Sequence, residues 1–327
     1  SLIIEAAKKS EIPAGSALAV DRSIFSEFMT NAIEKHPNIE VIRKEITELT
    51  EDLTIIATGP LTSNPLIEAL RSIISQEHLY FYDAIAPIID SMSIDHSKVY
   101  MSSRYGKGGD DYINCPLTKD EYNKFYDALL EADTVLAKDF EDIKVFEGCM
   151  PIEVMARRGR DTLRFGPLKP IGLPDPETGK IPYAVVQLRP ENKEKSAYNM
   201  VGFQTRLKWS EQKKVFRMIK GLEDAEFLRF GSIHRNTYIN SPMHLNVDLS
   251  HKRKNNIYLA GQITGVEGYI ESTAIGLLCG INAARRLLNL EPIVPSHRTA
   301  HGALLRHITN SDPKDFQPSN INFGLIS

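Results

Sequence analysis

The stretch 257–282 constrains the fold of this 327-residue chain more than any other segment. It begins with the apolar run Ile257–Ala260, which predicts a buried strand. A loop with Gly261, Gly265 and Gly268 follows and leads into a predicted helix that is rich in small residues. Glycines let backbone amides approach a ligand closely, and a helix N-terminus favours a negative group, so the pattern predicts a nucleotide site. In the alternative interpretation, these glycines serve only the packing of the helix on the sheet.

A second segment of the same kind lies much earlier in the chain. The apolar run Leu53–Ile56 predicts another buried strand, and Ala57, Thr58 and Gly59 follow it directly. Nucleotide-binding α/β proteins often end a strand in this way, where the chain passes beneath the dinucleotide. This signal is weak by itself. It gains weight because it precedes residues 84–245, whereas the Gly261 loop follows them.

The two segments flank a block whose pattern of apolar residues differs from theirs. Block 84–245 contains runs typical of antiparallel strands and predicts an inserted α+β domain. The flanking segments, 1–83 and 246–327, together predict one Rossmann-like domain, so the fold class is α/β with a split Rossmann-like domain around an insertion. The tail from Pro292 is polar, and we expect it to be irregular.

The usual dinucleotide fingerprint, G-x-G-x-x-G between a strand and a helix, does not occur in this sequence. The cluster Gly106–Gly109 is a polar loop that no buried strand precedes. Residues 1–9 resemble the last turns of a helix. We therefore expect the first βαβ unit to lie upstream of Ser1, and a fold of another kind is the alternative.

Cys149 is the best candidate for a reactive group. It comes shortly before Pro151, an acceptable first residue for a predicted helix over 152–157, and a helix N-terminus lowers the pKa of a thiol. From the chemistry alone, a buried inert thiol is as well supported as a nucleophile. Cys115 and Cys279 are expected to be inert, reduced thiols, because the three cysteines lack the spacing of a zinc site or a disulfide framework.

A set of cations in the middle block predicts contacts with RNA. Aromatic residues such as Tyr183 and Trp209 are interleaved with them, and surfaces of this kind suit folded RNA, whose phosphates position the ligand and whose unpaired bases stack. The candidates are Arg157, Arg158, Arg160, Lys169, Arg206, Lys208 and Arg235. A solvated charged face is the alternative, and the net charge of −3 argues against indiscriminate nucleic-acid binding.

Several protein classes are excluded by what the sequence lacks. No run approaches the roughly 18 apolar residues of a membrane span, so no membrane partner is expected. Residues 1–9 also lack the pattern of a secretion signal. No ligand spacing typical of a metal site occurs, and none is predicted. These properties are typical of a cytoplasmic protein.

Motifs along nearly the whole chain carry a resemblance to a known family. They are Ile12–Gly15, Ala19–Arg22, Thr54–Thr62, Tyr80–Ala84, Phe146–Ala156, Phe165–Pro170, Val201–Thr205, His234–Thr237, Phe316–Pro318 and the Gly261 loop. Together they are similar to the folate- and FAD-dependent tRNA (uracil-5-)-methyltransferases, the TrmFO family, which are related to the GidA/MnmG flavoproteins. The motifs around Cys149 and Phe165 separate TrmFO from those relatives.

The resemblance implies a reaction. Methylenetetrahydrofolate supplies a one-carbon unit to C5 of the T-loop uridine at tRNA position 54, reduced FAD supplies electrons, and NAD(P)H reduces the flavin again. Cys149 matches one of two active-site cysteines; the other, like the glycine fingerprint, is expected upstream of Ser1. The implied FAD-binding residues are Ala57, Thr58, Gly59, Gly261, Gln262, Thr264, Gly265, Glu267, Gly268, Tyr269 and Ser272. The alternatives are a GidA/MnmG-like modification of the wobble uridine and a non-catalytic RNA-binding module.

Overall fold

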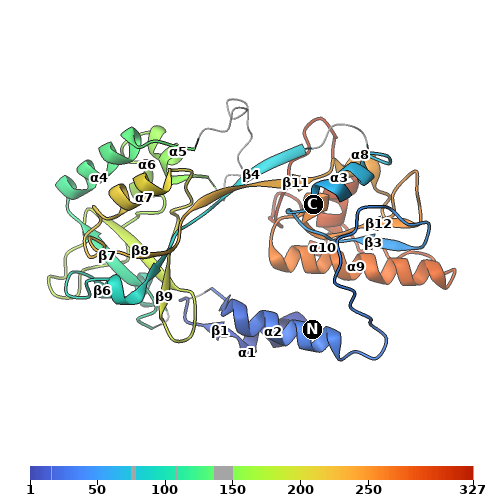
Figure 1. Cartoon of the computed structure of the whole chain (residues 1–327), viewed down its shortest axis with the longest axis horizontal. Coiled ribbons are helices and arrows are strands. Elements are labelled where there is room, and N and C mark those ends of the chain that lie inside the picture. Colours follow the sequence, from blue (N-terminus) through green and yellow to red (C-terminus); the bar gives the residue numbers. More distant parts are fainter. Residues whose placement is uncertain (16, 75–78, 108, 136–149, 327) are drawn as a thin grey trace. The chain divides into compact units, whose positions relative to one another are not determined.

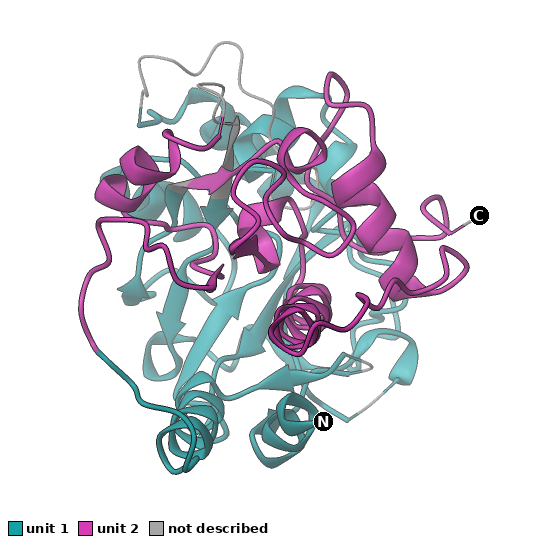
Figure 2. Ribbon diagram, turned by 90° about the vertical axis from the view of Figure 1, so that its right-hand side faces the viewer, with its two compact units in different colours: residues 1–42, 83–234 teal, residues 43–82, 235–327 magenta. Residues whose placement is uncertain are grey.

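The computed structural model describes residues 1–15, 17–74, 79–107, 109–135 and 150–326. The chain forms two compact units, each made of separate pieces of sequence (Figure 2). Unit 1 comprises residues 1–42 and 83–234, and unit 2 comprises residues 43–82 and 235–327. Strands β4 (Leu79–Ile85) and β11 (Ser232–Tyr238), in which the chain passes between the units, pair with each other.

Unit 1 is built on a six-stranded sheet in the order β10-β5-β9-β8-β7-β6. Every pairing in it is antiparallel, and the longest ladder joins β7 to β8 with Cys115 opposite Val186. The strands are β5 (Ile88–Asp90), β6 (Tyr100–Met101), β7 (Ile113–Leu117), β8 (Ala184–Pro190), β9 (Ala197–Met200) and β10 (Phe227–Arg229). The antiparallel sheet with its helices confirms the α+β character predicted for the middle block.

Helices α4 (Lys119–Glu131), α5 (Ile152–Arg157), α6 (Thr162–Phe165) and α7 (Trp209–Phe216) gather on one side of this sheet (Figure 1). Helix α4 begins at a capping box, in which Thr118 and Glu121 each bond the other's backbone amide. Its apolar side chains recur at helical spacing and are buried in the core of unit 1. Short 3-10 turns, η1 (Ser91–Ser93) and η2 (Arg104–Gly106), interrupt the connections between strands.

The first 42 residues belong to unit 1 by contact, whereas the sequence placed them with the nucleotide-binding segments. They form α1 (Leu2–Lys9), β1 (Glu11–Ile12), β2 (Ala19–Val20) and α2 (Arg22–Glu34). The Tyr112 hydroxyl donates to the Ala14 carbonyl at 3.0 Å, and the Gly15 amide donates to the Asp111 carboxylate at 2.8 Å. Contacts between residues so far apart in sequence leave no local signal, and the functional domain boundaries stay a prediction.

Unit 2 brings the two nucleotide-binding segments together. Strand β3 (Thr54–Ile56) pairs in parallel with β12 (Ile257–Leu259), with Thr54 opposite Ile257. Around this pair lie α3 (Asn64–Leu70), α8 (Ser241–His244), η4 (Gly261–Thr264), α9 (Tyr269–Leu287) and α10 (Ala300–Asn310). The parallel pairing across the insertion confirms that one α/β domain is divided between two segments.

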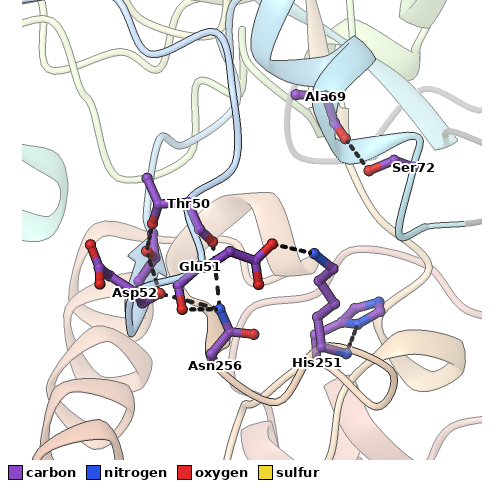
Figure 3. A network of polar contacts seen from close by, with 9 residues as sticks. Thr50, Glu51, Asp52, Ala69, Ser72, His251 and Asn256 are labelled. Atoms are coloured by element: carbon purple, nitrogen blue, oxygen red, sulfur yellow. Dashed lines mark hydrogen bonds and ion pairs between the residues drawn. The ribbon is translucent and has the colours of Figure 1, made fainter.

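A polar network fastens the turns that precede these two strands (Figure 3). The Asn256 side-chain amide donates to the carbonyls of Glu51 and Asp52 at 3.1 and 3.2 Å, and the Lys254 ammonium lies 3.0 Å from the Glu51 carboxylate. The ring of His251 accepts the Lys254 amide at 3.0 Å. These bonds hold the starts of β3 and β12 level with each other and so support their register.

The prediction of an irregular tail is wrong. Residues 300–310 form helix α10, whose N-cap Thr299 accepts the Gly302 amide. Its buried side chains include Leu304, Leu305 and Ile308. The apolar stripe is short and surrounded by polar residues, so its helical period was easy to overlook. Within the described residues, no helix is long and apolar enough to cross a membrane.

Candidate cofactor and RNA sites

The two glycine-containing turns of unit 2 meet at one edge of its parallel strand pair. Ala57 follows β3 and Gly261 follows closely after β12, and the Ala260 amide donates to the Ile56 carbonyl at 3.0 Å. In α/β sheets, ligands bind outside the carboxyl ends of the strands. The structure therefore brings together two sequence signals that are separated by the whole insertion.

The turn after β3 has a fixed shape and an open side. Gly59 has a φ of +70°, which favours glycine, and a Cβ there would meet nothing within 4 Å among the described residues. The Thr62 hydroxyl donates to the Gly59 carbonyl at 2.9 Å and lies 2.6 Å from the Thr58 hydroxyl. Ala57 and Thr58 are exposed. A ligand could approach the backbone here without displacing protein atoms.

The three glycines of the second loop have different reasons to be glycine. All have positive φ, namely +75° at Gly261, +83° at Gly265 and +99° at Gly268. A Cβ at Gly265 would lie 2.6 Å from the Phe316 ring, so packing explains this glycine. At Gly261 the nearest atom would be the Ser272 Cβ, 3.9 Å away at an ordinary contact distance, so the positive φ and not crowding favours glycine there. The packing interpretation thus holds for Gly265 and not for Gly261.

Internal hydrogen bonds hold this loop in place. The Gln262 side-chain amide donates to both oxygens of Glu267, at 3.0 and 3.1 Å. The Thr264 hydroxyl donates to the Gly261 carbonyl at 2.7 Å, and Thr264 is fully buried. The side chains of Gln262, Glu267 and Thr264 are therefore engaged in shaping the loop, although the sequence placed them among the cofactor contacts.

The N-terminus of α9 follows the loop directly and carries one acidic residue, Glu271, in its first turn. Gly268 is its N-cap and provides no side chain to satisfy the first amides of a 19-residue helix. Tyr269 is 92% exposed at the first position, and Ser272 is half-buried with its amide bonded to the Gly268 carbonyl. Such a terminus favours an anionic group such as a phosphate.

The cysteine predictions have separate outcomes. Cys149, the candidate nucleophile, lies outside the described residues. Helix α5 does cover Ile152–Arg157, with Pro151 as its N-cap rather than its first residue. Cys115 and Cys279 are free and buried, and burial raises the pKa of both thiols, that of Cys279 to about 12. Their burial is consistent with the prediction that both thiols are inert.

Several of the cations predicted to bind RNA are already paired. Arg160 lies 2.5 Å from the Asp127 carboxylate and over the Tyr126 ring, and Lys208 lies 2.9 Å from Asp133. By contrast Arg157 and Arg158 are exposed, and within the described residues neither has an acidic partner. Lys169 is half-buried and likewise has no acidic partner within the described residues. The side chain of Arg235 lies outside the described part.

Arg206 is paired with a buried carboxylate that the sequence did not single out. Glu153 is 1% exposed, accepts the Thr205 hydroxyl at 2.9 Å and the Arg206 amide at 3.0 Å, and lies 3.4 Å from the Arg206 guanidinium. Burial raises the pKa of Glu153. This cluster ties α5 to the segment before α7, so Arg206 has a structural partner.

The family profile described as "Glucose inhibited division protein A" matches residues 1–291. Over the whole chain, 57% of residues are identical to a protein from Geobacter sulfurreducens named "Methylenetetrahydrofolate--tRNA-(uracil-5-)-methyltransferase TrmFO", of which the chain covers 75%. The chain belongs to the TrmFO family. A TrmFO protein from Bacillus cytotoxicus is 55% identical over 327 residues and is also covered to 75%.

Among solved structures, those of GidA have a fold similar to that of this chain. Aquifex aeolicus GidA superposes with a TM-score of 0.69 at 17% identity, covering 93% of this chain and 56% of that one. A second crystal form gives 0.68, with 59% of that chain covered. The chain thus spans somewhat more than half of the GidA chain, and at this identity the likeness concerns the fold alone.

Proposed function

We propose that this TrmFO-family chain serves the methylation of uracil C5 in tRNA, at T-loop position 54, with methylenetetrahydrofolate as the one-carbon donor. The observation that carries the proposal is the 57% identity, over the entire chain, to a protein named for this reaction. The paired turns at the edge of β3 and β12 support it, because they offer a site for a phosphate-containing cofactor. The cytoplasm, where tRNA is modified, is the proposed location.

FAD is the proposed cofactor of unit 2. The open backbone at Gly59 and the N-terminus of α9, whose N-cap Gly268 has no side chain, fit a dinucleotide with its phosphates. Tyr269 and Ser272 lie in the first turn of that helix, where their side chains can contact a bound ligand. Reduced FAD supplies the electrons for a methyl group, and NAD(P)H is the proposed source of those electrons.

Cys149 is the proposed nucleophile. Uracil C5 is a poor nucleophile until a group adds to C6, and a thiolate is well suited to that addition. The assignment rests on the sequence motif around Cys149 and on its position just before α5. Arg157 and Arg158, at the end of the same helix, are proposed to contact tRNA phosphates because they are exposed and have no acidic partner in the described part.

The test is a methylation assay with purified protein, a tRNA transcript, methylenetetrahydrofolate, FAD and NAD(P)H, with 5-methyluridine measured by nucleoside analysis. The full-length G. sulfurreducens relative is the positive control. Formation of 5-methyluridine only at position 54 supports the proposal. Flavin binding and tRNA binding without any 5-methyluridine would contradict it, and modification of the wobble uridine instead would favour a GidA-like reaction.

A further inference from the structure

An aromatic stack ends at the surface of unit 1. The Trp209 ring, at the first position of α7, lies 5.4 Å from the Phe230 ring with an angle of 15° between their planes. Phe230 in turn lies 5.2 Å from Phe227, again at 15°. Trp209 is 64% exposed, and Phe230 is its only ring contact in the described part of the chain. Much of the indole surface is therefore accessible to a further ring.

The inner end of the stack is anchored in the core. Phe227 packs against Phe216 at 6.5 Å, and Phe216 meets Phe203 edge-to-face at 5.3 Å. Phe216 and Phe203 are fully buried. A ring held in this way loses little conformational freedom when a partner stacks on it, so Trp209 is pre-organised for binding.

The surroundings of Trp209 are basic although the whole chain is acidic. Segment 206–220 has six basic residues and one acidic residue, against a net charge of −3 for the chain. Among the basic residues, Arg206, Lys208 and Lys214 are ion-paired with Glu153, Asp133 and Glu211. Lys213 and Lys214 are exposed on α7, and the Lys213 ammonium lies 5.7 Å from the centre of the Phe230 ring. A protein-docking hot spot usually has apolar neighbours, whereas cations beside an open aromatic ring match a nucleic acid.

We propose that Trp209 stacks on an unpaired base of an RNA, with Lys213 contacting an adjacent phosphate. This inference rests on the proposed function, because that function provides the RNA. Unpaired bases are the parts of a folded RNA that aromatic side chains recognise, and stacking tolerates any base because each has a π-face. Trp209 would thus help to hold a tRNA whose loop bases are accessible.

The test uses the fact that Trp209 is the only tryptophan of the chain, so its fluorescence reports on this position alone. Titration with a tRNA transcript should quench the fluorescence in parallel with binding measured by filter retention. Trp209→Ala should weaken binding roughly 5- to 100-fold, and Trp209→Phe should weaken it less, since a ring remains. Met92→Ala, which truncates another exposed apolar side chain of unit 1, should leave binding unchanged.

The salt dependence separates stacking from charge. Trp209→Ala should leave the slope of log affinity against log salt unchanged, whereas Lys213→Ala should reduce its magnitude by about one. Wild-type binding of tRNA with unchanged affinity in Trp209→Ala would overturn the inference and favour a protein partner for this surface. If the wild-type chain binds no tRNA, the RNA substrate of the proposed function is lost and the role of Trp209 with it.

Discussion

Phe316 lies against Gly265 so closely that a Cβ on residue 265 would come within 2.6 Å of the Phe316 ring. The contact is reinforced by the backbone, because the Ser319 amide donates to the Gly265 carbonyl at 3.0 Å and the Ser319 carbonyl accepts the Glu267 amide at 2.9 Å. The segment with Phe316 and Ser319 therefore packs against the glycine loop and stabilises its conformation. The shape of the candidate cofactor site depends on residues about 50 positions away, beyond the reach of local sequence patterns.

This contact predicts a coupled pair of substitutions. Phe316→Ala should lower the free energy of unfolding by about 3–5 kcal/mol, because the ring is 2% exposed and packs on Tyr238 and His307. Gly265→Ala should cost about 1–3 kcal/mol through the positive φ and the clash with the ring. In the Phe316→Ala background, Gly265→Ala should cost less, since only the φ strain remains. Chemical denaturation of the four proteins measures this, and strictly additive costs would contradict the packing argument.

Two buried histidines predict a loss of stability in acid. His244 and His251 stack with ring centroids 5.8 Å apart, and burial, with His251 nearby, lowers the pKa of His244 from 6.5 to about 4. A folded pKa below the unfolded one means that the unfolded chain binds more protons between these pH values. Stability should therefore be full above pH 6.5 and fall towards pH 4, by at most about 3 kcal/mol from this residue.

Denaturation curves at several pH values test the histidine prediction. His244→Gln should flatten the dependence between pH 6.5 and 4, whereas His297→Gln, at an exposed position, should leave it as in the wild type. The same slope in both variants would mean that acid acts through other groups.

We expect Arg157 and Arg160 to differ in their contribution to RNA binding. Arg157→Ala should weaken tRNA binding and reduce the magnitude of the salt slope by about one, because this exposed guanidinium has no acidic partner in the described residues. Arg160→Ala is the matched control, since Arg160 is held 2.5 Å from Asp127. Filter binding over a range of salt concentrations measures both, and equal slopes for the two variants would show that the ion pair does not decide which cation meets RNA.

We expect substitution of Cys149 to remove methylation while tRNA binding is retained. Cys149→Ala should abolish 5-methyluridine formation, because alanine cannot add to C6, while tRNA affinity stays within about twofold of the wild type. Cys115→Ala is a control at a buried thiol whose pKa is raised by burial. It should retain methylation as far as the protein remains folded, which circular dichroism can verify. Methylation by the Cys149→Ala variant at the wild-type rate would contradict the role of Cys149 as a nucleophile and favour an inert thiol.

The sequence by itself determined the features that depend on local pattern. The apolar run before Gly261, the small-residue helix after it and the apolar run before Ala57 all predict their elements, since strand and helix periods depend on neighbouring residues. Motifs spread along the chain were enough to indicate the TrmFO family.

Only the tertiary structure decided which of those residues are available to a ligand. Thr264 is buried and bonded within its own loop, and the Phe316 ring packs against Gly265, whereas no described atom lies within 4 Å of a Cβ at Gly59. Arg160 is paired with a carboxylate from another helix, while Arg157, three positions earlier, has no acidic partner among the described residues. The physical reason is the same in each case: burial and pairing depend on residues that are distant in sequence, and their positions are fixed only when the chain is folded.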